Sequence, residues 1–287
     1  KSMKKAMKRA ISTGIVCVMT TALFSGCATK ATPENLLRDM EENAEETKSA
    51  MVNVKMNMGM TADSEEISMG IDMDMESTTE PEASYAMGSV SVGMAGMNFD
   101  VELETYSVVE WEEYVTYTLM EDQWTREVSD AEELADEVGS ITENMAEYAD
   151  RFELSESLVT VNDQDCYELT GELDGDLIGD MMQTDMMDEF SGYDIDESVF
   201  SNMVFPCTIA IYQDSILPAR VYVDMTDTFA SLMEDAGISI SECYMDITFM
   251  EYDTVDEITV PEEALSEAVD VDNTDGGSGL SDDGSSL

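Results

Sequence analysis

The sequence predicts an α+β fold in which an amphipathic helix precedes a meander of antiparallel strands. The main observation is a change of hydrophobic period near residue 51. Before it, apolar residues recur at spacings of three or four, which is typical of one helix face; this stripe consists of Leu36, Met40, Ala44, Thr47 and Met51. After it, apolar and polar residues alternate, as in strands with one buried and one wet face. Thr32 and Pro33 supply a capping hydroxyl and a first-turn proline for the helix.

Four alternating runs follow the helix and are separated by short polar turns. They cover residues 52–60, 67–75, 85–94 and 97–103. The third run slips in phase near Gly88, where we expect a β-bulge. Because the side-chain period of a strand is two, this reading assigns one definite set of apolar side chains to the buried face.

The rest of the chain continues the alternation of strands and helices. Residues 194–204 are ambiguous, and the Gly/Ser/Asp-rich stretch after Asp270 predicts a disordered tail. The expected elements are strands at 115–120 and 124–128, a helix at 130–149, a hairpin at 158–161 and 166–173, a helix at 177–190, a hairpin at 207–212 and 220–225, a helix at 228–236, and a long strand at 240–252.

The N-terminal residues are typical of an export signal. KSMKKAMKR is basic and is followed by a short apolar run, which falls below the roughly 20 residues needed to span a bilayer. The stretch Phe24-Ser25-Gly26-Cys27 resembles the lipobox of bacterial lipoproteins, in which the cysteine thiol is acylated. We therefore expect a lipoprotein signal peptide at 1–26, a lipidated tether at 27–32, one domain at 33–268 and a tail at 269–287. Acyl chains such as palmitate on Cys27 would anchor the protein to the outer face of the cell membrane.

The charge of the chain excludes several classes of partner. All 65 acidic residues follow Cys27, with only seven basic residues, which gives that part a net charge of −58. Such a surface repels nucleic acid and anionic lipid headgroups. Three cysteines remain in the domain, namely Cys166, Cys207 and Cys243. Buried free thiols are the simplest reading of them, although a disulfide between two of them stays open.

The order of predicted elements, together with the lipobox at Cys27, resembles the superfamily of lipoprotein carriers (LolA-like) and mycobacterial lipid-transport lipoproteins. Within it, the chain is most similar to uncharacterised lipoproteins of Gram-positive bacteria. The segments that carry this resemblance are TPENLL at 32–37, DQDCYELTGEL at 163–173, IYQDSILPARVYVDM at 211–225 and DITFMEYDTVDEITVPEEA at 246–264. The resemblance implies a single strongly curved antiparallel sheet, an open half-barrel, with helices packed in its concave face. It also implies a hydrophobic ligand held between sheet and helices.

The methionines agree with such a groove, because a flexible and polarizable side chain adapts to different ligand shapes. Ten of the 25 methionines lie between Met51 and Met97. In the predicted register, eight side chains line the concave face beneath the first helix and are the candidate ligand-binding residues: Met56, Met58, Met69, Ile71, Met73, Phe99, Val101 and Leu103. Ordinary core filling is the alternative reading of the same residues.

The sequence favours binding over catalysis. Histidine is absent, which removes the usual nucleophile–histidine pairs, and no phosphate-binding glycine motif is present. Asp-rich stretches such as 270–275 lack the spacing of a calcium loop. We therefore expect a monomer with no enzymatic activity, no metal and no cofactor. Two functions remain: an acyl-chain carrier, favoured by a void above roughly 300 Å³ under the helices, and an envelope sensing or protein-interaction module, favoured by a filled core with an exposed apolar patch.

Overall fold

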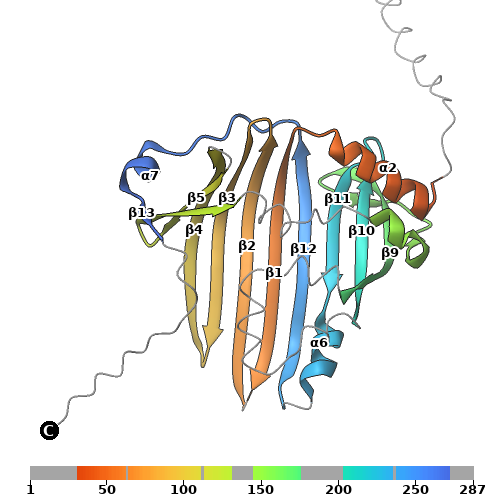
Figure 1. Cartoon of the computed structure of the whole chain (residues 1–287). Coiled ribbons are helices and arrows are strands. Elements are labelled where there is room, and N and C mark those ends of the chain that lie inside the picture. Colours follow the sequence, from red (N-terminus) through yellow and green to blue (C-terminus); the bar gives the residue numbers. More distant parts are fainter. Residues whose placement is uncertain are drawn as a thin grey trace, which may run out of the picture.

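The computed structural model describes residues 31–62, 64–110, 113–130, 145–175, 203–234 and 237–271. Several predicted features lie outside these residues: the signal peptide, Cys27, the helix at 177–190, most of the helix at 130–149 and nearly all of the tail. Within them the predicted fold class is confirmed. One large, open, curved sheet forms the body of the molecule, and a few short helices pack against it (Figure 1).

Over the described ranges the sheet has 13 strands, and neighbouring strands in the chain mostly pair with each other. Its spatial order is β13-β6-β5-β4-β3-β2-β1-β12-β11-β10-β9-β7, with β8 paired to β9. All pairings are antiparallel except the short parallel contact of β13 with β6. The strands are β1 (Ser49–Ala62), β2 (Glu65–Thr79), β3 (Glu82–Met94), β4 (Met97–Glu110), β5 (Glu113–Met120), β6 (Gln123–Asp130), β7 (Glu153–Leu154), β8 (Val159–Val161), β9 (Gln164–Asp174), β10 (Val204–Tyr212), β11 (Pro218–Asp224), β12 (Ser239–Tyr252) and β13 (Val269–Asp270).

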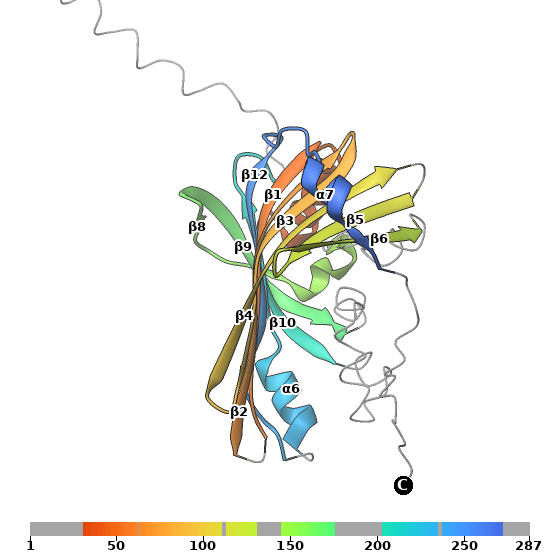
Figure 2. The same ribbon diagram turned by 90° about the vertical axis from the view of Figure 1, so that its left-hand side faces the viewer.

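Seen from the side, the sheet is strongly twisted and curved. β2 and β4 run nearly vertically in Figure 2, whereas β5 and β6 swing away toward the side that carries α6. We call this side the inner face of the sheet and the opposite side the outer face. The helices are α2 (Pro33–Glu45), the 3₁₀ helix η1 (Met145–Arg151), α6 (Thr226–Met233) and α7 (Glu262–Glu267).

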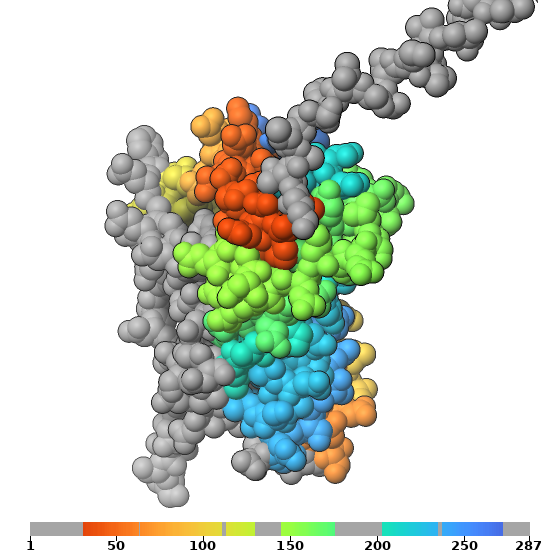
Figure 3. Space-filling model, turned by 90° about the vertical axis from the view of Figure 1, so that its right-hand side faces the viewer, coloured from red at the N-terminus to blue at the C-terminus, as the bar shows by residue number. Residues whose placement is uncertain are grey.

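The main core lies between the inner face and the helices α2, η1 and α6. Figure 3 shows the side of the molecule on which α2 (red-orange) and α6 (blue) lie. Leu37 and Met40 of α2 and Met145 of η1 are fully buried there, against strands β9 to β12 and β1. Each such side chain contributes about 1.5–3 kcal/mol through the apolar surface that it removes from water. These three helices are therefore fixed to the half of the sheet formed by β9 to β12 and β1.

The first helix begins where the sequence predicts but ends earlier. The Asn35 amide donates to the capping Thr32 hydroxyl (3.3 Å), and the helix stops at Glu45, so Met51 belongs to β1. The reason lies in distant contacts: the Lys48 amide donates to the Asp253 carboxylate (2.7 Å), and the Asp253 amide donates to the Ser49 carbonyl (2.9 Å). These bonds hold the start of β1 beside the end of β12, so the helix ends before the last residues of the apolar stripe.

The bulge predicted at Gly88 is wrong. Gly88 pairs in register with Met73 of β2 and Leu103 of β4. A Cβ atom at this position would lie 2.7 Å from the Met73 Cα, so glycine permits the close approach of β2. Irregularities of register occur instead in the β1–β12 pair, between Met51 and Val52 and between Gly59 and Met60, and in the β10–β11 pair, between Ala210 and Ile211.

The buried side of the sheet changes from one end to the other. At β5 and β6 the outer face is the buried one, where Val115, Tyr117 and Trp124 pack against Ala264 of α7. A further cluster on the outer face packs Cys166 and Tyr212 under β8. The inner face of β2, β3 and β4 therefore keeps a row of apolar side chains that no described helix covers completely.

Candidate ligand-binding face

The eight candidate residues lie on one face of the sheet, because directly paired residues of neighbouring strands share a face. Two cross-strand rows contain most of them. The rows are Met58–Met69–Val92–Phe99 and Met56–Ile71–Val90–Val101. A third row, Val54–Met73–Gly88–Leu103, completes the set. This is the inner face, since Met58 and Met56 also pair with Cys243 and Met245 of the main core.

In the row of Met58, burial falls from β1 toward β4. Met58 is 6% exposed, and Met56, Met69, Ile71, Met73, Val101 and Leu103 are half-buried. Phe99, at the far end of its row, is 56% exposed. The candidate residues thus form one continuous apolar surface that is closed at β1 and open at β4.

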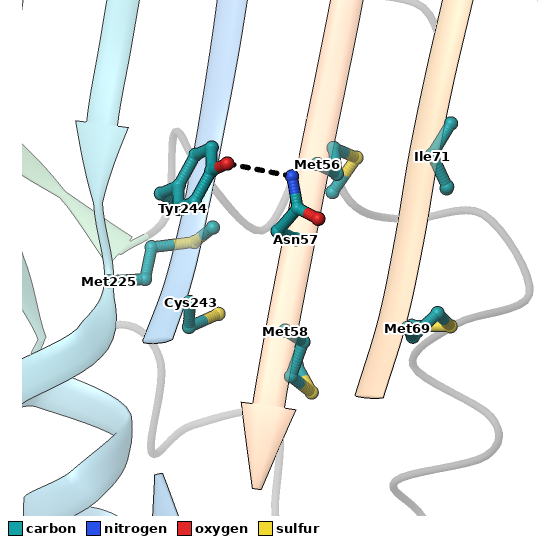
Figure 4. Close-up of a pocket in the computed structure, with 8 residues that line it drawn as sticks. All are labelled: Met56, Asn57, Met58, Met69, Ile71, Met225, Cys243 and Tyr244. Carbon is teal, nitrogen blue, oxygen red and sulfur yellow. Dashed lines mark hydrogen bonds between the residues drawn. The ribbon is translucent and has the colours of Figure 1, made fainter. Parts of the chain in front are cut away.

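The closed end holds a small pocket. Four candidate residues line it, Met56, Met58, Met69 and Ile71, and Met225, Cys243, Asn57 and Tyr244 complete the lining (Figure 4). Its volume is about 10 Å³, which is room for one water molecule at most. Among the described residues, this end of the face is therefore packed and does not form the large void expected beneath the helices.

The element over this pocket is not the predicted one. α2 lies at the other half of the sheet, where the Asn43 side chain donates to the Ser215 carbonyl (3.1 Å) before β11. The pocket is bordered instead by Met225, directly before α6. The Met225 amide donates to the Cys243 carbonyl (2.8 Å), and the Cys243 amide donates to the Thr226 hydroxyl (3.0 Å). These bonds fix the start of α6 on β12, and the Met225 side chain therefore lies beside Met58 in the pocket lining.

Sequence reasoning missed Met225 and Cys243 as neighbours of this site. Cys243 falls on the apolar phase of the strand at 239–252, but only its pairing with Met58 places it beside the methionines. Met225 continues the alternation of Val221 and Val223, but only the turn from β11 into α6 brings it beside Met58.

The open end of the face carries an exposed apolar patch. Val92 pairs with Phe99, and Met94 pairs with Met97. Their side chains are between 40% and 56% exposed, and Met120, which follows on the same face, is 49% exposed. We call these five residues, Val92, Met94, Met97, Phe99 and Met120, the open patch. Contiguous exposed apolar surface of this kind marks a place where proteins bind apolar ligands or partners.

A larger hollow adjoins the open patch at the edge of β4. Its volume is about 720 Å³, and its lining combines apolar Val101, Leu103 and Leu119 with several acidic residues. The acidic residues in the lining are Asp100, Glu102, Glu104, Glu121 and Asp122. Val101 and Leu103 line it from the inner face, whereas Leu119 and the acids of β4 belong to the outer face, so the hollow combines apolar with strongly negative surface.

The three domain cysteines are free and buried. Burial in apolar surroundings raises the pKa of the Cys207 thiol to about 12, and burial together with the Asp224 carboxylate does the same for Cys243. Burial also raises the pKa of Cys166. These thiols are therefore almost wholly protonated at neutral pH and are weak nucleophiles.

We expect the three thiols to react with a thiol reagent only when the chain unfolds. At pH 8, the native chain should release less than one equivalent of chromophore from a disulfide reagent, and three should appear in denaturant, with Cys27 and Cys17 replaced by serine. The folded chain favours the neutral form of Cys207 and Cys243, so both thiols contribute to the free energy of unfolding below their unfolded pKa near 9. This contribution falls as the pH rises from 9 toward 12. Rapid reaction of any native thiol at pH 8 would contradict this burial.

Neither a metal centre nor a membrane-spanning helix is found in the described part of the chain. No group of three or more potential ligand side chains is arranged to hold a metal ion there. No helix there is long and apolar enough to cross a bilayer. The absence of enzymatic activity stays a prediction.

The sequence matches the model of one protein family. Residues 32–269 match the model of a family of unknown function, DUF6612. The protein belongs to this family. The match spans the helix α2 and the sheet up to the start of β13, so the face described above is part of the family domain. No curated protein matches the sequence.

Solved structures of similar shape include two mycobacterial lipoproteins. LprF from Mycobacterium bovis is 15% identical, with a TM-score of 0.47, over 80% of this chain and 96% of that one. Lipoprotein LppX from Mycobacterium tuberculosis is 14% identical, with a TM-score of 0.48, over 79% and 98% of the two chains. A DUF1329 family protein from Desulfovibrio piger is 10% identical, with a TM-score of 0.23, over 78% and 93%.

Proposed function

We propose that the protein is a lipid-anchored lipoprotein of the cell envelope that binds the acyl chain of a hydrophobic ligand on its inner face. The observation that carries this proposal is the continuous apolar surface from Met58 to Phe99, which is closed at β1 and open at β4. Its methionines adapt to a flexible chain without a fixed shape. Each methylene that the ligand buries there contributes about 0.8 kcal/mol.

The ligand enters at the open patch. The packed end of the face, with its pocket of about 10 Å³, offers no room for an acyl chain. The side chains of β2, β3 and β4 in these rows are half-buried or exposed, so a chain laid across Met69, Val92 and Phe99 removes apolar surface from water on both partners. Cys27 supplies the membrane anchor and holds this face near the source of such ligands.

A protein-interaction or sensing module is the second candidate. It is favoured by the packed end of the face combined with the exposed side chains of the open patch, which are the features of a filled core with a docking surface. The two candidates differ in whether an isolated acyl chain binds at all.

The substitution Phe99→Asp should weaken ligand binding without destabilising the fold. Phe99 is 56% exposed, so the aspartate stays hydrated and the free energy of unfolding should change by less than about 1 kcal/mol. The acyl chain, however, would have to cover the new charge, and we expect affinity for a fluorescent acyl ester to fall at least about tenfold. A neutral ester suits the assay because the protein is strongly negative.

Two matched variants control this experiment. Phe99→Leu keeps an apolar side chain and should bind the probe nearly as well as the wild type. Asn98→Asp adds the same carboxylate one residue away, on the outer face, and should leave binding unchanged. Equal probe binding by Phe99→Asp and the wild type would contradict the assignment of the ligand to this face.

A further inference from the structure

We propose that the free edge of β4 binds an extended basic peptide of a partner protein, which adds to the sheet as a further strand. β3 pairs with β4 along its whole length, from Met97 to Val108. β5 pairs with β4 only from Leu103 onward. In the described ranges, no strand occupies the second edge of Met97–Glu102, so a run of backbone donors and acceptors is open to a partner strand.

The side chains of this edge specify the sequence of the partner. Asn98, Asp100 and Glu102 are exposed on the outer face, whereas Phe99 and Val101 lie on the inner face. Side chains that are opposite each other across two strands share a face and interact. A peptide with basic residues on one face and apolar residues on the other would therefore pair each acid with a base and each apolar side chain with another.

The hollow beside the edge has the same two-sided character. It measures about 720 Å³; Val101 and Leu103 line it from the inner face, and Leu119 lies on the outer face beside Glu104. The β5–β6 turn adds Glu121 and Asp122 to the three acids of β4, and no basic residue is part of the lining. Long basic side chains on the outer face can lay their methylene stems on Leu119 and place their charge among the carboxylates.

The charge decides between the possible occupants. A second copy of this chain would bring its own Asp100 and Glu102 against this acidic edge, and like charges in paired strands are destabilising. The same repulsion keeps the free edge from pairing between copies. A cationic strand replaces repulsion by attraction, so the edge is selective for a basic partner. This inference does not rest on the acyl-chain proposal, which concerns the inner face.

The test uses the full-length chain in nanodiscs of zwitterionic lipid and a fluorescently labelled heptapeptide, Lys-Val-Lys-Val-Lys-Val-Lys. The comparison peptide, Lys-Lys-Val-Lys-Val-Val-Lys, has the same charge and composition without the alternation. At physiological salt we expect the alternating peptide to bind at least about tenfold more tightly, because only it can satisfy both faces of an added strand. Its binding should also slow hydrogen exchange of the Met97–Glu102 amides.

A pair of charge-reversed proteins locates the site. Asp100→Lys combined with Glu102→Lys should weaken binding of the alternating peptide at least about tenfold. Asp256→Lys combined with Glu257→Lys makes the same change in charge at exposed positions of the loop between β12 and α7, and should alter binding less than about threefold. Equal affinity for the two peptides, equal loss in the two variants, or unchanged exchange at Met97–Glu102 would each overturn the proposal.

Discussion

Replacing Met58 by aspartate should destabilise the whole domain by at least about 4 kcal/mol, a large share of the 5–15 kcal/mol that stabilises a typical domain. Met58 is 6% exposed and sits where β1, β2 and β12 meet, paired with Met69 and Cys243. The described residues around it offer no base to neutralise the new carboxylate, because the pocket lining is apolar apart from Asn57 and Tyr244. Those two side chains already bond to each other (2.8 Å).

Thermal unfolding followed by circular dichroism measures this effect. We expect the midpoint to fall by about 10 °C or more, since each kcal/mol corresponds to about 2–4 °C in a domain of this size. Met58→Leu keeps the volume and apolarity and should cost less than about 1.5 kcal/mol. A midpoint for Met58→Asp within 2 °C of the wild type would mean that this side chain is not buried in the native fold.

Cys27→Ser should abolish attachment of the mature protein to the membrane. The serine hydroxyl cannot take the place of the thiol that the lipoprotein pathway acylates, and two or more acyl chains are what makes such anchoring stable. In cells, we expect the wild-type protein in the membrane fraction, and the variant either unprocessed or released. Cys17→Ser, within the apolar run of the signal, is the matched control and should change nothing.

Mass spectrometry of the N-terminal peptide checks the chemistry directly. The mature chain should begin at Cys27 and carry the added mass of acyl groups. An unmodified Cys27 in a wholly soluble wild-type protein would contradict the lipoprotein assignment, although the acyl-binding face could still be tested on its own.

Alternation predicted the strand register of the candidate face but not its surroundings. The period of two puts the apolar side chains of each strand on one face, and the pairing of β1 to β4 brings Met58, Met69 and Phe99 to the same face of the sheet. The phase slip in β3 predicts a bulge because Tyr85 and Met87 are apolar. In the structure both belong to the outer face, where Tyr85 packs against Tyr106 with ring centroids 4.8 Å apart.

The parts that could not be predicted depend on contacts between distant residues. The length of α2 is limited by Asp253, about 200 residues further along the chain. The change of the buried side at β5 depends on α7, whose Ala264 covers Val115 and Tyr117. Local alternation shows that such a strand has an apolar face, but only the pairing register and the covering helix decide on which side of the sheet that face lies.

The central claim is that the inner face binds an acyl chain, and native mass spectrometry of the protein purified from its own envelope tests it most directly. The protein should be released from its anchor by cleavage of the tether, so that covalent and bound lipid are distinguished. We predict a second species that is heavier by the mass of one lipid, and that disappears in Phe99→Asp but persists in Asn98→Asp. A single lipid-free species, together with no saturable binding of the acyl ester probe by the wild type, would contradict the carrier function and leave the protein-interaction module as the function of this domain.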